Sequence, residues 1–202
     1  MKGIVLAGGK ATRLPNKPLL PMHNGKPVIT SGIDFLWHNG VREITVVVPP
    51  RSPIKHVLRM WYDRHIDYVV QWEPLGVPQA IAIGAQDEPV LVVFCDNVYS
   101  LVRSTIPDLT GHTVMTVDDP IKARDLSKYD GERSAFVHEA ASTICLAGFM
   151  VVQPDALAVA HHFKDNITFL NAVGAVPFTW SDDEWWDLGT ADAYRRYWET
   201  FQ

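Results

Sequence analysis

The first segment whose residue types could do chemistry is a glycine-containing loop near the N-terminus. Gly8 and Gly9 follow the apolar run at residues 3–6, and two cations, Arg13 and Lys17, come shortly afterwards. Glycine lets backbone N–H groups approach an anion closely, and Arg and Lys supply the positive charge that a polyphosphate needs. This pattern predicts a phosphate-binding loop.

The loop differs from two widespread phosphate motifs. A Walker A loop needs Gly-Lys-Ser/Thr in series and the dinucleotide fingerprint needs three spaced glycines, and the segment contains neither pattern. The alternative interpretation is a glycine-rich turn with two solvated cations, because short motifs produce false positives. The remaining segments of the chain must decide between these interpretations.

Alternating strands and helices would place this loop at the edge of a sheet. Apolar runs rich in β-branched residues, typical of buried parallel strands, occupy residues 3–6, 43–48, 66–70, 89–94 and 113–117. Helical patterns fill the gaps, as at Ile29, Ile33 and Leu36, and Asn39-Gly40 supplies a helix stop. The alternation predicts an α/β fold with a doubly wound, mostly parallel sheet and right-handed crossovers.

The second half of the chain is less regular. The polar residues 118–129 are interpreted as an insertion or a substrate-side loop, whereas residues 134–138 and 143–152 predict two further strands. Thr190 is a plausible N-cap for a closing amphipathic helix. We expect a small irregular β region on this side of the sheet.

Composition limits the cellular setting and the partners. With 202 residues, 47% hydrophobic and 20% charged, the chain can bury one sizeable core, and we expect a single domain over 1–202. Its halves would be a nucleotide-binding part, 1–117, and a substrate-binding part, 118–202.

The net charge of -5 argues against a nucleic-acid partner. Two cysteines in apolar runs, Cys95 and Cys145, and the lack of a membrane-length segment favour the cytoplasm over a membrane or an oxidising compartment.

The loop also resembles a known family, the sugar-phosphate nucleotidyltransferases of the glucose-1-phosphate thymidylyltransferase type. Their signature, Leu-Ala-Gly-Gly-x-Gly-Thr-Arg-Leu followed by Pro-Lys-x-Leu, is similar to residues 6–19, with Ala11 in place of the third glycine. The resemblance implies a Rossmann-like fold of the nucleotide-diphospho-sugar transferase type and catalytic roles for Arg13 and Lys17. It implies nucleotide binding by Leu6, Ala7, Gly8, Gly9, Lys10, Ala11 and Thr12. The short spacing from Arg13 to Lys17 looks more like cytidylyltransferases that activate acidic sugars.

A second landmark lies at residues 73–80, which resemble a Gly-Leu-Ala-Gln-Ala stretch whose glutamine amide reads a pyrimidine edge. The resemblance gives this nucleotide-binding role to Gln79, with Gly76 beside it. An amide offers both a donor and an acceptor, as a uracil or thymine edge requires. The alternative is a solvated glutamine at a helix N-terminus.

Two aspartates match positions at which the family holds a metal. Asp96 follows the run at 89–94, where the family has Gly-Asp-Asn, and Asp187 lies in a Trp-x-Asp-x-Gly-Thr motif. A carboxylate at the carboxyl end of a parallel strand lies on the edge where ligands bind. The resemblance therefore implies that both bind Mg²⁺ or Mn²⁺, hard cations that take oxygen ligands. A strand-ending turn and a helix-entry turn are the alternatives.

The acceptor side is assigned from resemblance alone. Gly131, Glu139 and Gly148 resemble the sugar-binding stretch of the family, although Ala140 stands where a lysine is usual. Lys164 is a candidate contact for the acceptor phosphate, and a solvated helix-end lysine is its alternative.

The resemblance implies transfer of a nucleoside monophosphate from an NTP to a sugar 1-phosphate with release of pyrophosphate. A pyrimidine NTP (dTTP, UTP or CTP) is the expected donor, and a sugar 1-phosphate or another phosphorylated small molecule is the expected acceptor. One alternative is a guanylyl- or cytidylyltransferase acting on a cofactor precursor or an acidic sugar. Another is a non-catalytic nucleotide-sensing or scaffold domain. Homo-oligomerisation is left open.

Overall fold

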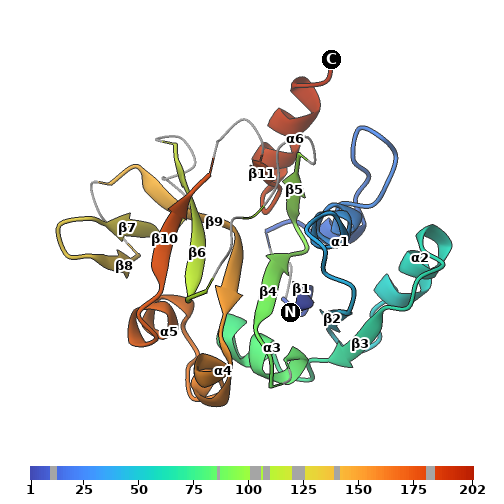
Figure 1. Ribbon diagram of the computed structural model, residues 1–202. Coiled ribbons are helices and arrows are strands. Elements are labelled where there is room, and N and C mark those ends of the chain that lie inside the picture. The colour runs from blue at the N-terminus through green and yellow to red at the C-terminus, as the bar shows by residue number, and fades with distance from the viewer. Residues whose placement is uncertain are drawn as a thin grey trace.

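The computed structural model describes residues 1–9, 13–85, 87–100, 106, 110–119, 126–138, 142–180 and 185–202. Strands and helices alternate along them (Figure 1). The elements are β1 (Lys2–Leu6), η1 (Lys17–Leu19), α1 (Ile29–His38), β2 (Ile44–Val48), α2 (Ile54–Trp61), β3 (Asp67–Val70), α3 (Val77–Gly84), β4 (Val90–Phe94), β5 (Asn97–Tyr99), β6 (Thr113–Asp118), β7 (Lys128–Asp130), β8 (Ala135–Val137), β9 (Ile144–Val152), α4 (Pro154–Ala160), α5 (Asn166–Ala172), β10 (Val176–Thr179), β11 (Trp185–Asp187) and α6 (Ala191–Glu199).

Nine strands of the described residues form one sheet, in the order β10-β6-β9-β4-β1-β2-β3, with β7 paired to β9 and β8 to β7. β1 is parallel to β2 and β4, and β2 is parallel to β3. β9 runs antiparallel to β4 and β6. β5 and β11 form a separate antiparallel ribbon. The predicted α/β class with a mostly parallel central sheet is therefore confirmed.

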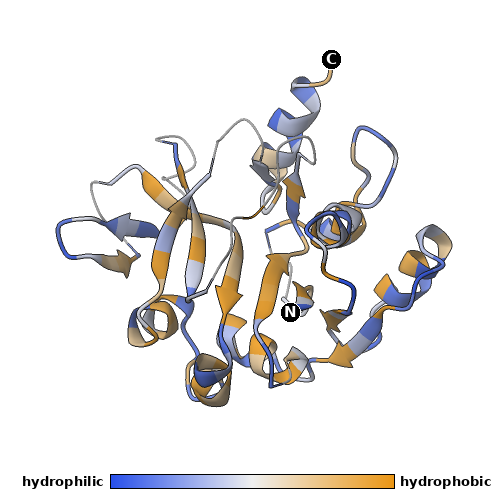
Figure 2. Cartoon of the chain, viewed as in Figure 1, coloured by the Kyte–Doolittle hydropathy of each residue, from blue (hydrophilic) through white to orange (hydrophobic). Residues whose placement is uncertain are grey.

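The central strands are apolar throughout because both of their faces are covered by helices. Along β1, Val5 packs with residues of α1 and α2 such as Phe35 and Leu58. Its neighbour Ile4 points to the other face and packs with residues of α3 and α5 such as Ile81. Figures 1 and 2 show these strands as apolar segments lying between the two helical layers. Burying both faces gives near-continuous apolar runs, which is why the sequence showed them so clearly.

The predicted stop of the first helix is confirmed. α1 ends at His38, the backbone N–H of Asn39 donates to the carbonyl of Phe35 at 3.1 Å, and Gly40 has φ +81°. Glycine enters this left-handed region without the steric cost that a side chain would add. The chain is thereby turned toward β2.

The second half carries more regular structure than the sequence indicated. Residues 134–138 and 143–152 contain β8 and β9 as predicted, but the polar segment 118–129 is not loop throughout, because β7 begins at Lys128. The backbone of β7 pairs with Cys145 of β9, and this pairing compensates for its polar sequence.

Among the described residues, no helix is long and apolar enough to cross a membrane.

The closing helix, α6, begins at the predicted cap. The Thr190 side chain accepts a hydrogen bond from the backbone N–H of Ala193 at 3.1 Å, and Tyr197 in the body of the helix is fully buried. The cap satisfies one of the backbone donors that every helix N-terminus leaves without an intrahelical partner.

Thr190→Ala should lower the free energy of unfolding by about 1 kcal/mol, because it removes this capping oxygen. Thr190→Ser keeps the oxygen and should stay close to the unsubstituted protein. Urea unfolding followed by circular dichroism measures both values, and an Ala variant as stable as the Ser variant would contradict the capping role.

Candidate active site

The two predicted metal-binding aspartates are brought together by the β5–β11 ribbon. Asp96 directly precedes β5, Asp187 ends β11, and Asp187 pairs with Asn97 in the ladder. The backbone N–H of Leu188 donates to the carbonyl of Asp96 at 2.8 Å, so the two segments are joined beside both carboxyl groups. Residues from two distant parts of the chain thus meet at the edge of the sheet.

Gly189 shows how closely the charged groups converge. A Cβ atom on Gly189 would lie 3.0 Å from Oδ1 of Asp187, 3.5 Å from Oδ2 of Asp96 and 3.7 Å from a guanidinium nitrogen of Arg13. The backbone N–H of Gly189 also donates to Oδ1 of Asp187 at 2.8 Å. The glycine therefore leaves open a small space that three charged side chains surround.

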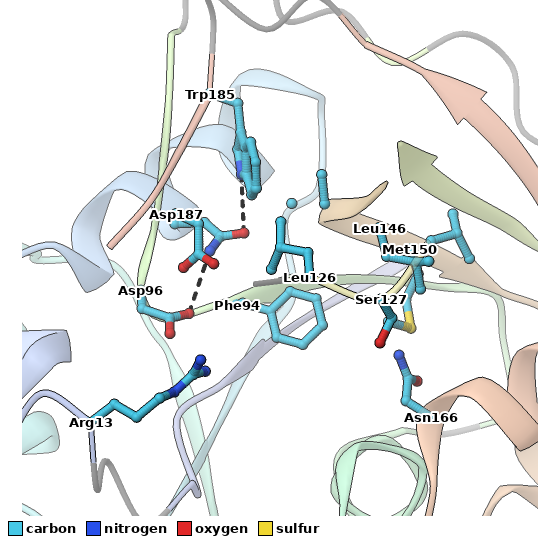
Figure 3. Close-up of a pocket in the computed structure, with 14 residues that line it drawn as sticks. Arg13, Phe94, Asp96, Leu126, Ser127, Leu146, Met150, Asn166, Trp185 and Asp187 are labelled. Atoms are coloured by element: carbon cyan, nitrogen blue, oxygen red, sulfur yellow. Dashed lines mark hydrogen bonds between the residues drawn. The ribbon is translucent and has the colours of Figure 1, made fainter. Parts of the chain in front are cut away.

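Both predicted cations reach this space. Lys17, on the first turn of η1, forms an ion pair and a hydrogen bond with Oδ2 of Asp96. Arg13 is exposed, and its guanidinium points toward the two carboxylates (Figure 3). The structure therefore gathers Arg13, Lys17, Asp96 and Asp187 at one edge of the sheet.

The surroundings of Asp187 disfavour the negative charge of its carboxylate. Burial, followed by the neighbouring charge of Asp96, raises the pKa of Asp187 to about 6, although the Gly189 N–H and the charges of Lys17 and Arg13 oppose the rise. Burial alone would lower the pKa of Lys17, but the charge of Asp96 and its hydrogen bond raise it above the ordinary value. A site of this kind favours a further cation.

The oxygen ligands of the two aspartates fit a hard divalent cation that takes its remaining ligands from water or a bound phosphate. Two carboxylates from separate segments supply anionic oxygens, and such ions readily take phosphate and water as further ligands. No group of three or more His, Cys, Asp or Glu side chains with metal-binding geometry occurs among the described residues. Protein ligands alone would therefore not saturate the ion.

A pocket of about 530 Å³ opens beside the glycine loop. Its lining includes the predicted residues Leu6, Ala7, Gly8, Gly9, Arg13, Lys17, Gly76 and Asp96. The remaining predicted loop residues, Lys10, Ala11 and Thr12, lie outside the described residues. We refer to this hollow as the loop pocket.

Two glycines of the loop pocket lie in close contact with neighbouring groups. A Cβ atom on Gly8 would lie 2.2 Å from Oε1 of Gln71. Gly76 has φ +111°, and a Cβ atom there would lie 2.1 Å from the carbonyl oxygen of Lys164. A side chain at Gly76 would meet backbone in a strained conformation, so this position requires glycine, whereas a side chain at Gly8 would displace the Gln71 amide.

The structure does not bring Gln79 to the loop pocket. Its amide Nε2 donates to the carbonyl of His161 at 3.3 Å, so the side chain links α3 to the end of α4. A different amide, that of the buried Gln71, lines the pocket and lies against Gly8. The sequence contained a signal for Gln71, since it directly follows the apolar run at 66–70 and hence stands at the carboxyl edge of a parallel strand.

A second pocket, of about 220 Å³, shares Arg13, Phe94 and Asp96 with the loop pocket, and we refer to it as the ribbon pocket (Figure 3). Residues of both halves of the chain line it: Arg13, Phe94, Asp96, Asn97, Val114, Leu126, Ser127, Leu146, Ala147, Gly148, Met150, Asn166, Trp185 and Asp187. Its wall is fixed partly by Trp185, whose indole N–H donates to Oδ1 of Asn97 at 3.0 Å.

The predicted acceptor residues divide into two groups. Gly148 lines the ribbon pocket. Gly131 instead lies in the exposed turn that joins β7 to β8, and Lys164 is an exposed residue just before α5; neither lines a pocket described above. The turn location explains Gly131, because glycine is common where hairpin strands reverse. Glu139 lies outside the described residues.

A parallel sheet whose carboxyl edge carries a glycine loop, two cations and two partly buried carboxylates has its charged groups where open α/β proteins bind ligands. Residues 3–123 match the model of the MobA-like NTP transferase domain, and the chain belongs to that family. The predicted membership of a nucleotidyltransferase family is confirmed.

Curated relatives match part of the chain. Glucose-1-phosphate thymidylyltransferase of Neisseria meningitidis serogroup A is 37% identical over 112 residues, which cover 49% of this chain and 38% of that protein. The corresponding protein of Mycobacterium tuberculosis is 35% identical over 114 residues, with the same two shares. The chain thus matches less than half the length of these relatives.

Solved structures show the same fold over nearly the whole chain. A UDP-glucose pyrophosphorylase complexed with UDP-glucose has a TM-score of 0.81 at 17% identity, covering 99% of this chain and 97% of that chain. An inositol-1-phosphate CTP transferase from T. maritima has a TM-score of 0.79 at 14% identity, covering 97% and 93%. At these identities the likeness extends to the fold alone.

Asp187→Asn should raise the free energy of unfolding in metal-free buffer at pH 8 by about 3 kcal/mol, because it removes a charge that burial and Asp96 disfavour. The folded-state pKa of Asp187 lies above the unfolded value of 3.8, so the destabilisation is absent below about pH 4 and complete above about pH 6. The stability gain should therefore vanish at pH 4. Chemical unfolding with EDTA at both pH values measures it, and an Asn variant less stable at pH 8 would contradict this electrostatic account.

Proposed function

We propose that this chain is a nucleotidyltransferase that transfers a nucleoside monophosphate from an NTP, preferably a pyrimidine NTP, to a sugar 1-phosphate and releases pyrophosphate. The observation that carries the proposal is that the loop pocket and the ribbon pocket share Arg13, Phe94 and Asp96. A donor in one pocket and an acceptor in the other would meet at the charged groups between them. This is the arrangement that a transfer reaction requires.

The donor would bind in the loop pocket. The backbone at Gly8 and Gly9 can approach the phosphates, and exposed Arg13 can reach the β- and γ-phosphates. Lys17 would exchange part of its contact with Asp96 for the α-phosphate, on which negative charge builds up during transfer. We assign the base-reading role to Gln71 in place of Gln79, because Gln71 alone of the two lines this pocket.

The acceptor would bind in the ribbon pocket with its phosphate toward Asp96 and Asp187. A phosphate monoester is already anionic near neutral pH, so one of its oxygens can attack the α-phosphorus without a protein base. Mg²⁺ or Mn²⁺ held by the two carboxylates would neutralise charge on both substrates. Arg13 stands between the pockets and would align the two phosphates for in-line attack.

We also propose that residues 1–202 act as one domain, with a nucleotide-binding half at 1–117 and a substrate-binding half at 118–202. The lining of the ribbon pocket supports this division, because it draws the carboxylate Asp96 from the first half and Asp187 from the second.

A guanylyl- or cytidylyltransferase acting on a cofactor precursor or an acidic sugar remains the second candidate. The short Arg13 to Lys17 spacing favours it, since both cations reach the same carboxylates without the longer spacer of the thymidylyltransferase type. An NTP panel assayed with both sugar 1-phosphates and acidic-sugar or cofactor-precursor acceptors separates the two candidates.

Pyrophosphate release tests the proposed reaction. The protein should release pyrophosphate with Mg²⁺, a pyrimidine NTP and a sugar 1-phosphate, and Asp96→Asn should reduce kcat by at least about 100-fold because the metal loses a ligand. Every combination of the four NTPs with several sugar 1-phosphates should be assayed. A folded protein that releases none in any combination would instead be a non-catalytic nucleotide-sensing or scaffold domain.

Gln71→Leu should weaken the preference for a pyrimidine NTP by about 10-fold or more while the phosphate contacts persist, because it removes the base-edge amide. Gln79→Ala is the matched control and should leave the preference unchanged, because that amide is bonded to His161. Competition between UTP and ATP measures the preference. Loss of preference in the Gln79 variant alone would restore the role to Gln79.

A further inference from the structure

The ribbon pocket has two polar ends separated by an apolar wall (Figure 3). Arg13, Asp96 and Asp187 occupy one end. Ser127 and Asn166 face each other at the other end, and apolar side chains lie between the two groups. The proposed function uses the charged end and gives no role to the far end.

Asn166 carries an unsatisfied group at this far end. Its Oδ1 is fully buried and has no hydrogen-bond partner. Buried polar groups in native proteins are nearly always hydrogen-bonded, and an unsatisfied one needs an explanation. Its position is also well fixed, because Asn166 begins α5 directly after the N-cap Asp165, which accepts from the backbone N–H of Thr168 at 2.7 Å. The amide is thus fixed at the pocket, and its nitrogen, which points toward Ser127 in Figure 3, is the atom open to a ligand, because the buried Oδ1 is closed to a water-sized group.

Ser127 supplies the complementary group. Its backbone carbonyl accepts from the N–H of Leu146 at 2.7 Å, which fixes the segment beside β9. Its hydroxyl has no hydrogen-bond partner among the described residues. A ligand hydroxyl between them could accept from the Asn166 amide N–H and donate to the Ser127 hydroxyl oxygen.

The wall between the two ends suits a saturated ring. Phe94, Leu126, Leu146 and Met150 present apolar surface along the pocket, against which the C–H groups of a pyranose can pack. With the anomeric phosphate held at the carboxylate end, the ring atom directly across from it is C4. A hydroxyl on C4 would therefore point to the far end.

We propose that Ser127 and Asn166 form the specificity end of the acceptor site and hydrogen-bond the C4 hydroxyl of a pyranose 1-phosphate. This inference rests on the proposed function and deepens it, because it names the part of the acceptor that the protein reads. Neither residue belongs to the charged group that handles the phosphates.

The test compares three acceptors: glucose 1-phosphate, galactose 1-phosphate, which has the opposite C4 configuration, and 4-deoxyglucose 1-phosphate, which lacks the C4 hydroxyl. Of glucose 1-phosphate and galactose 1-phosphate, the one that the unsubstituted protein prefers should have a kcat/KM at least about 10-fold above that of 4-deoxyglucose 1-phosphate. The reason is that the deoxy compound leaves Ser127 and Asn166 without a hydrogen-bond partner. In Asn166→Ala and Ser127→Ala, the ratio of kcat/KM for the preferred hydroxylated acceptor to kcat/KM for the deoxy compound should fall toward one.

The fall should come from a higher KM for the hydroxylated acceptor, while the KM for the NTP stays unchanged. Asn166→Leu, which fills the space without a polar atom, should lower the ratio in the same way. Ser52→Ala is the matched control, since the Ser52 hydroxyl accepts from the N–H of Ile54 at 3.3 Å and lines neither pocket. Circular dichroism verifies that each variant is folded.

The outcomes separate this inference from the proposed function. Folded Asn166 and Ser127 variants that turn over with the original acceptor ratio would overturn the inference and leave the proposed function standing. An unsubstituted protein that uses 4-deoxyglucose 1-phosphate as well as the hydroxylated sugars would do the same. No pyrophosphate release with any sugar 1-phosphate would remove the proposed function and this inference together.

Discussion

The structure depends on holding two carboxylates side by side against their mutual repulsion. The β5–β11 ribbon does this with backbone hydrogen bonds, among them Leu188 N–H to the Asp96 carbonyl, which are insensitive to side-chain charge. Burial makes the repulsion larger and raises the pKa of Asp187. Lys17 and Arg13 balance part of the charge, so the site is built around a deficit of positive charge that a ligand or an ion can fill.

The two pockets both open at this group of charged side chains, because Arg13 and Asp96 line both of them. The loop pocket places backbone and the Gln71 amide on one side of it, and the ribbon pocket places a mostly apolar wall on the other. Because the substrates would differ in charge, the division is physically sensible: phosphates need the cations and the edge of the sheet, whereas a sugar ring needs surface and a few hydrogen bonds. The matched NTP transferase family model covers residues 3–123, which include the glycine loop and Asp96.

The sequence predicted what depends on local or periodic signals. The parallel strands of the first half, the stop at Asn39-Gly40 and the cap at Thr190 all follow from residue patterns within a few positions, and the structure has them. Short strands such as β7, with the polar sequence Lys-Tyr-Asp, were missed because their stability comes from pairing with a distant strand.

The same contrast holds at the site. Arg13, Lys17, Asp96 and Asp187 stand in motifs, and the structure gathers them. Gln71 and Gln79 are both amides between β3 and β4, and the packing against Gly8 and the contact to His161 show which of them lines the loop pocket. Ser127 and Asn166 stand in no motif at all, because their relation exists only once the segment before β7 has joined β9 and the start of α5 lines the same pocket.

One contact has an evolutionary consequence. The backbone of Gly76, in the wall of the loop pocket, lies directly against the carbonyl of Lys164, just ahead of the helix that carries Asn166. Because Gly76 has no side chain, backbone lies directly against backbone here, and a shift of the Gly76 backbone would also move the backbone at Lys164. Base preference and sugar preference would then not diverge independently among relatives with this junction. A lineage that changes one would tend to acquire compensating substitutions around the other.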